Sequence, residues 1–237
     1  MTANSPTATN VLLRFLSLAD NLLRGRVELL AKDERKKLLT GILAVMVAGG
    51  LVYGAVMGSY ADSLAGIRPM QVLYSAVKLP FLLMATFCIS LPSFYVVNAL
   101  LGLHADFGSA IRALMSTQAA LTIILAGFAP LTFFWYVSGA SYEQALVFNS
   151  IMFGIASLSA QILLRRLYRP LIDRDRRHAW MVRAWLVIYT FVGIQMGWVL
   201  RPFIGSPYEP TTFFRKEAWG NAYLVVIDLF SNLLLGR

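Results

Sequence analysis

Few residues of this chain have side chains and spacing suited to chemistry. His104 and Asp106 stand two positions apart, and such a pair could serve as acid and base in a lipid enzyme at the membrane surface. His178 lies in a basic stretch and Cys88 in an apolar one. Two histidines and one cysteine are too few ligands for a haem or a metal centre. We therefore expect no cofactor and assign no catalytic residue.

Polar residues inside apolar runs form a second set of candidates. Burial of a polar group in a membrane is costly, so such residues often line a solute path or hydrogen-bond to another helix. Lys78 precedes Pro80 at the boundary of an apolar run, and we expect its ammonium to extend to the lipid headgroups. The runs have no central Asp or Glu, which argues against a proton- or sodium-coupled transporter. The candidates for a pore or a partner surface within the runs are Lys78, Asn98 and Gln118.

Three glycines recur at four-residue spacing in the first apolar run, at Gly50, Gly54 and Gly58. This spacing places them on one helix face, where the missing side chains let a second helix come close. That helix could belong to the same bundle or to a second copy of the chain, and the sequence leaves both readings open. We predict a helix-packing role for all three glycines.

Membrane-spanning helices must position these residues. Of the 237 residues, 58% are hydrophobic and 14% are charged, against roughly 25% charged in an average soluble domain. Each of five apolar runs is close to the roughly 20 residues that cross a bilayer. The pattern predicts an all-α, polytopic transmembrane helical bundle embedded in lipid. The five runs are residues 38–57, 79–103, 113–137, 145–164 and 181–200.

Basic residues cluster at the ends of these runs and account for the net charge of +9. Their placement fits anionic lipid and topology better than nucleic acid, which we do not expect as a partner. One cluster precedes the first run and another lies between the fourth and fifth, so the positive-inside rule places both clusters, and the N-terminus, in the cytoplasm. The second cluster could hold lipid headgroups or only set the topology. It comprises Arg165, Arg166, Arg169, Arg174, Arg176 and Arg177.

The chain divides into three regions. Residues 1–37 are expected to form a cytoplasmic tail with an amphipathic helix over 11–30, and residues 38–200 the transmembrane bundle. Residues 201–237 would be an extracytoplasmic loop and an interfacial helix. The helical part, 218–235, is short for a span, and a surface-lying or bundle-packed helix is favoured over a sixth crossing. The loop either joins an aromatic belt or is ordered and binds a partner or caps a pore. Its candidate residues are Arg201, Pro202, Phe203 and Trp219.

Several motifs together resemble a known group. They are Val77–Pro80, Leu91–Phe94, Asn98–Gly102, Trp198–Pro207 and Phe213–Arg215. Between residues 72 and 223 the chain resembles a group of uncharacterised bacterial polytopic inner-membrane proteins. In hydropathy it is similar to the five-span Ypt/Rab-interacting membrane proteins. The resemblance implies five spans in a bacterial inner membrane and no known chemistry.

Three functions remain open from the sequence. The first is a non-catalytic scaffold or accessory subunit that binds another membrane protein or forms a homo-oligomer, which the glycine stripe, the amphipathic helix and the stiff loop favour. The second is a channel or small-solute transporter, favoured by the polar residues of the spans and by prolines that bend helices. The third, a membrane-bound lipid enzyme, rests on His104 and Asp106 alone.

Overall fold

The computed structural model describes residues 8–25, 35–60, 68–206, 209–215 and 224. All regular elements in these ranges are helices, so the all-α fold class is confirmed. Trp219 and nearly all of the expected C-terminal helix, 218–235, lie outside the described residues. The helices are α1 (Ala8–Leu23), α2 (Arg35–Gly58), α3 (Pro69–Leu100), α4 (Phe107–Val137), α5 (Tyr142–Arg174) and α6 (Arg177–Leu200), with a 3-10 turn, η2 (His104–Asp106), before α4.

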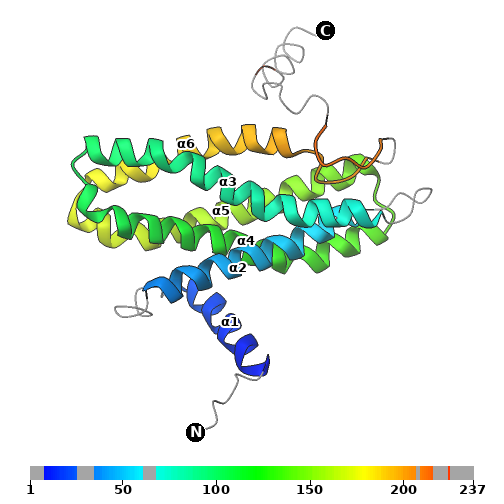
Figure 1. Cartoon of the computed structure of the whole chain (residues 1–237), viewed down its shortest axis with the longest axis horizontal. Helices are drawn as coiled ribbons and strands as arrows, with labels where there is room; N and C mark the ends of the chain where they lie inside the picture. The colour runs from blue at the N-terminus through cyan, green and yellow to red at the C-terminus, as the bar shows by residue number, and fades with distance from the viewer. Residues whose placement is uncertain (1–7, 26–34, 61–67, 207–208, 216–223, 225–237) are drawn as a thin grey trace.

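Five of these helices, α2 to α6, are long and apolar enough to cross a membrane. In space α2 packs between α3 and α4, while α4 also packs on α5 and α3 on α6. The remaining pair, α5 and α6, touch only sparingly. Figure 1 shows the resulting elongated bundle, with α1 projecting from one side of it. The five apolar helices make this a multi-pass membrane protein. Their packing order is α5–α4–α2–α3–α6, and α5 and α6 at its two ends are only loosely packed on each other.

The glycine stripe of α2 lies against α3. A Cβ atom added at Gly58 would stand 2.6 Å from the carbonyl oxygen of Gln71, and one added at Gly50 would stand 3.1 Å from the Cβ of Pro80. At Gly54 the nearest atom would be the carbonyl oxygen of Ser75. Only glycine permits this approach of two backbones. In the structure the stripe thus packs against another helix of the same chain, which is the first of the two interpretations.

Two helices extend beyond the apolar runs that predicted them. The third helix begins at Pro69, ten residues before the run that starts at Leu79, because its first turns bury polar rather than apolar side chains. The fifth helix continues to Arg174, ten residues past the run that ends at Leu164. The arginines expected in a loop therefore lie mostly on α5. A charged residue ends an apolar run, but it does not end a helix, because arginine has a good helix propensity.

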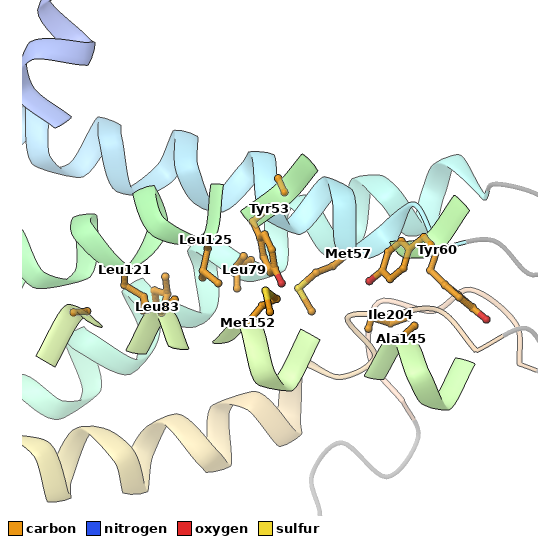
Figure 2. Packing of buried hydrophobic residues seen from close by; sticks show 14 residues of the cluster. Tyr53, Met57, Tyr60, Leu79, Leu83, Leu121, Leu125, Ala145, Met152 and Ile204 are labelled. Atoms are coloured by element: carbon orange, nitrogen blue, oxygen red, sulfur yellow. The ribbon is translucent and has the colours of Figure 1, made fainter. Parts of the chain in front are cut away.

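The core between α2 and α5 combines apolar packing with one polar network. Figure 2 shows Tyr53, Met57 and Met152 meeting between the two helices. Within this core the hydroxyl of Tyr53 donates to Asn149 Oδ1 at 3.0 Å, and Asn149 Nδ2 donates to the hydroxyl of Tyr136 at 2.5 Å. Because these bonds join α2, α4 and α5, they fix the relative positions of three helices; each contributes about 0.6 kcal/mol in a membrane.

The first helix spans Ala8–Leu23 and so begins before the expected 11–30, of which residues 26–30 lie outside the described ranges. It packs through Leu22, which is fully buried in a cluster with Ile42 and Val45 of α2. On other faces Leu13 and Leu16 are 58% and 53% exposed. The helix is thus attached to the bundle along one stripe and presents a second apolar stripe outward.

Candidate functional site

Residues 201–206, here called the cap segment, fold back across the end of the bundle (Figure 1). Side chains of α3 and of Arg68, the residue before this helix, hold it by donating to its backbone carbonyls. Lys78 Nζ donates to Pro202 O at 2.9 Å, Ser75 Oγ donates to Phe203 O, and Arg68 donates to Ser206 O at 2.8 Å. These contacts satisfy carbonyl groups that no helix pairs. The sequence left two interpretations of this loop open, an aromatic belt and an ordered loop. The contacts are those of an ordered loop that closes one end of the bundle.

Lys78 does not extend to the lipid headgroups as the sequence suggested. The residue is fully buried, and its ammonium lies 4.9 Å from the ring centre of Phe213 while bonded to the cap segment. The expectation was wrong because α3 begins at Pro69, which places Lys78 well inside the helix and under the cap segment. No carboxylate of the described residues forms an ion pair with this ammonium.

A cavity of about 410 Å³, here called the cap cavity, lies beneath the cap segment. This volume is within the range of small-molecule sites. Two guanidinium groups line it, those of Arg201 and Arg215, and no carboxylate of the described residues does. Its other lining residues are Met57, Leu79, Leu82, Tyr142, Leu146, Asn149, Ser150, Phe153, Pro202, Phe203 and Ile204.

The two arginines are held in different ways. Arg201 stacks on the ring of Trp198, 3.3 Å from its centre, and Arg215 pairs with Glu209 at 3.1 Å. The Nε atom of Arg215 is buried and has no acceptor among the described residues. Arg215 is also near enough to Lys78 for the two charges to repel. Among the described residues, the end of the bundle that carries the cap segment is therefore electropositive.

A second cavity of about 330 Å³, here called the central cavity, lies between α3, α4, α5 and α6. Half of its fourteen lining residues are polar, which is unusual for the interior of a membrane bundle. Gln118 accepts a hydrogen bond from the hydroxyl of Tyr189 at 2.8 Å. The side-chain oxygens of Thr86 and Gln161 are buried without a partner in the described structure. The seven polar residues are Thr86, Thr117, Gln118, Ser157, Gln161, Tyr189 and Thr190.

The two cavities adjoin, since Leu82 and Phe153 line both. Along α5 their lining runs from Tyr142 to Gln161. At 1.5 Å per residue this stretch of helix is roughly 28 Å long. The hydrocarbon core of a bilayer is about 30 Å thick. The cavities therefore extend, one after the other, along most of the length of a membrane crossing.

The opposite end of the bundle carries an ionic cluster in place of the expected His104–Asp106 pair. Asp106 accepts from Arg174 at 2.7 Å and lies 3.3 Å from the imidazole of His178, whereas His104 is exposed. The expected pair fails because residues two apart in a 3-10 turn point in different directions. Since His178 is fully buried, the cluster ties the start of α4 to the α5–α6 junction and offers no open acid–base site.

The remaining candidates are dispersed. Asn98 is fully buried, with both polar side-chain atoms unpartnered among the described residues, and lies in neither cavity. Arg177 donates to Leu101 O at 2.9 Å, and Arg165 and Arg166 are exposed. Asp173 lies 3.9 Å from Arg169 on the same exposed face. Only the cap residues, from Arg201 to Phe203, and Gln118 therefore belong to the cavities.

The sequence did not identify some of the residues that line the cap cavity or the central cavity. Arg215 was not singled out, because nothing local shows that its segment returns to the bundle. Tyr189 and Thr86 were missed because single hydroxyl groups are common in membrane helices and gain meaning only when four helices bring them together. In the described residues no cluster of three or more His, Cys, Asp or Glu side chains could hold a metal ion. No family model matches this chain, and neither curated proteins nor solved structures provide a match.

Proposed function

We propose that this protein is a channel or small-solute transporter whose solute moves along the cap cavity and the central cavity. The observation that carries the proposal is the succession of these cavities over roughly 28 Å of α5, close to the thickness of a hydrocarbon core. Side chains on α3 to α6 separate the path from the rest of the bundle. Leu82 and Phe153 stand at its narrowing.

The polar lining of the central cavity supports this function. In a bundle that serves only as a scaffold, apolar side chains would fill this space at lower cost, because unpartnered polar atoms in hydrocarbon are unfavourable. Thr86 and Gln161 line this cavity, and their side-chain oxygens are buried without a partner among the described residues. The apolar runs have no central carboxylate, which favours a passive mechanism over ion coupling.

Flux into proteoliposomes tests this proposal. Stopped-flow light scattering would measure the uptake of glycerol, choline and butanesulfonate, which differ in charge and are all permanent in that charge at neutral pH. We expect protein-dependent uptake of at least one of them, and a slower rate for Gln118→Leu, which removes the acceptor of Tyr189. The matched control is Gln195→Leu, since Gln195 lies on α6 but lines neither cavity. Uptake equal to that of protein-free liposomes for all three solutes would refute transport.

We also propose that the protein resides in a bacterial inner membrane with its N-terminus in the cytoplasm, as in the group it resembles. The support is the concentration of arginines at the α5–α6 junction, because basic residues favour the cytoplasmic side. With Cys88 changed to Ser, single cysteines at exposed Ser138 and exposed Arg176 report on the two ends. A membrane-impermeant maleimide should label Ser138→Cys in intact cells and Arg176→Cys only after lysis. The reverse pattern would invert the orientation.

A scaffold or accessory subunit is the second candidate. The glycine stripe and the cap segment are engaged inside the bundle, so this function now depends on α1. Leu13 and Leu16 on that helix are both more than half exposed, a surface that fits a membrane-protein partner or a second copy. Purification in mild detergent followed by native mass analysis should then show a complex. This complex should dissociate in the double variant Leu13→Gln with Leu16→Gln. A lone monomer would count against the scaffold.

A further inference from the structure

We propose that the cap cavity binds an anionic amphiphile, a molecule with a carboxylate or phosphate head and an apolar tail. Arg201 and Arg215 would hold the head, and the tail would lie along Leu146 and Phe153 of α5. This inference rests on the proposed transport path and names the class of its solute. The same chemistry is found in a free fatty acid and in a phospholipid such as phosphatidic acid.

The charges at this end of the bundle favour an anion. The described cations here are Arg68, Lys78, Arg201 and Arg215, against two carboxylates. Of these carboxylates Glu209 pairs with Arg215, while Glu143 is exposed on the first turn of α5. The positive-inside rule disfavours a cationic cluster at an end remote from the arginines of α5. Topology therefore gives no reason for these cations, whereas a bound anion does.

Lys78 strengthens this argument. A buried ammonium is unfavourable unless a counter-charge or several hydrogen bonds offset its lost hydration. Its contacts in the described structure are one carbonyl, Pro202 O, and the face of Phe213. Pro202, whose carbonyl oxygen accepts from Lys78, also lines the cap cavity, so an anionic head bound there would lie against the segment that Lys78 holds. Such a head would offset the mutual repulsion of Lys78 and Arg215.

The rest of the lining favours an apolar tail over an inorganic anion. Eight of the thirteen lining residues are apolar, and they cannot replace the hydration shell of a small ion. Leu146 is 41% exposed and Ser150 is also exposed, so the α5 side of the cavity faces outward. Since α5 and α6 touch only sparingly, a tail can reach the cavity sideways from the bilayer. An amphiphile of the membrane is the solute that fits both features.

Photocrosslinking of the full-length protein in a neutral detergent tests the proposal. The probes are palmitate and phosphatidic acid that carry a diazirine on the acyl chain, and labelled peptides are identified by mass spectrometry. We expect labels in 142–157 and 198–215. Excess oleate or dioleoyl phosphatidic acid should remove these labels, whereas dioleoyl phosphatidylcholine and inorganic phosphate should not. Labelling by palmitate alone would identify a free fatty acid, and labelling by phosphatidic acid alone a phospholipid; either result supports the proposal.

Variants make the test specific to the site. Arg201→Gln with Arg215→Gln should lower labelling of these peptides about tenfold or more, because a hydrogen bond to a charged group is lost at each arginine. The matched control is Arg165→Gln with Arg169→Gln, which removes the same charge from the opposite end of α5 and should leave these labels unchanged. A second variant, Leu146→Trp, fills the cavity from its exposed side without altering the cap segment and should also abolish labelling.

Three results would overturn the inference: uniform labelling of all helices, equal displacement by phosphatidylcholine, or full labelling of both cavity variants. The labelling and flux experiments distinguish a failure of the binding proposal from a failure of the transport proposal. Specific labelling without flux of butanesulfonate, the anionic probe with an apolar chain, would leave the amphiphile site standing and refute the transport function. Flux without specific labelling would do the reverse.

Discussion

A single methyl group on the glycine stripe of α2 should distinguish packing within the bundle from self-association. In Gly54→Ala the new Cβ would overlap the carbonyl oxygen of Ser75 and stand 2.9 Å from the Cα of Ala76. Both obstacles are backbone atoms of α3, so neither can rotate away. The two helices must therefore separate along their contact, which also loosens the neighbouring contacts of Gly50 and Gly58.

The size of the effect follows from two opposing contributions. Overpacking costs about 1 to 3 kcal/mol, and the upper half of that range applies here because backbone must move. Alanine regains about 1 kcal/mol through its better helix propensity. We expect a net loss of about 1 to 2 kcal/mol in the free energy of unfolding. Reversible unfolding of the purified monomer in mixed micelles of SDS and a mild detergent would measure it.

Gly154→Ala supplies the matched control. Gly154 lies on α5, and a Cβ added there meets no atom within 4 Å. The same substitution should therefore be neutral or stabilise by up to about 1 kcal/mol. If Gly54→Ala behaved like Gly154→Ala, or if it changed the oligomeric state while leaving the stability of the monomer intact, the close approach of α2 and α3 would be wrong. The stripe would then act between copies.

Three further predictions concern the polar network of the core, the cap segment and the boundary between the two cavities. Asn149→Leu leaves the hydroxyls of Tyr53 and Tyr136 without their shared partner and should lower unfolding free energy by about 1 to 3 kcal/mol in the same assay, with no change for Ser159→Ala on the outer face of α5. Lys78→Met keeps the volume but releases Pro202 O, so backbone amide hydrogen exchange across residues 201–206 should accelerate while α4 stays protected; unchanged exchange would show that Lys78 does not hold the cap segment. Phe153→Ala should join the two cavities and raise proteoliposome flux several-fold without changing which solute is carried, and a lower flux would mean that Phe153 is not the narrowing.

The number of spans could be predicted from the sequence because the length of an apolar run is set by bilayer thickness. Helix ends could not, and the first turns of α3 show why. Gln71 and Ser75 are polar, yet both are buried. Their side chains donate to the carbonyl oxygen of Phe203, which belongs to a segment more than a hundred residues later in the chain. Hydropathy reports only on contact with lipid or water, so a helix that buries polar side chains against another part of the same chain looks like a loop.

The candidate site was foreseen only in part, for a similar reason. Lys78, Gln118 and Arg201 were identified because a charge or an amide near a span is conspicuous by itself. Tyr189 was not, because it becomes meaningful only through its bond to Gln118, 71 positions earlier. Asn98 is as conspicuous as Gln118, yet it lies in neither cavity. Residue type thus identifies polar groups that need an explanation, while helix packing decides which of them face a common space.

The two ends of the bundle use positive charge differently, and this difference connects topology with function. On α5 and at its junction with α6 the arginines are mostly exposed or paired with acids, such as Arg174 with Asp106, as residues that only orient a membrane protein should be. At the cap end Lys78 is buried and Arg215 is half-buried with a donor unused among the described residues. Burial of charge is unfavourable, and the fold does not require it here, since apolar side chains could hold the same segment. A charge kept in such a place is best explained by a ligand of opposite charge, which is why the cap cavity, rather than the more numerous arginines of α5, is where binding should be sought.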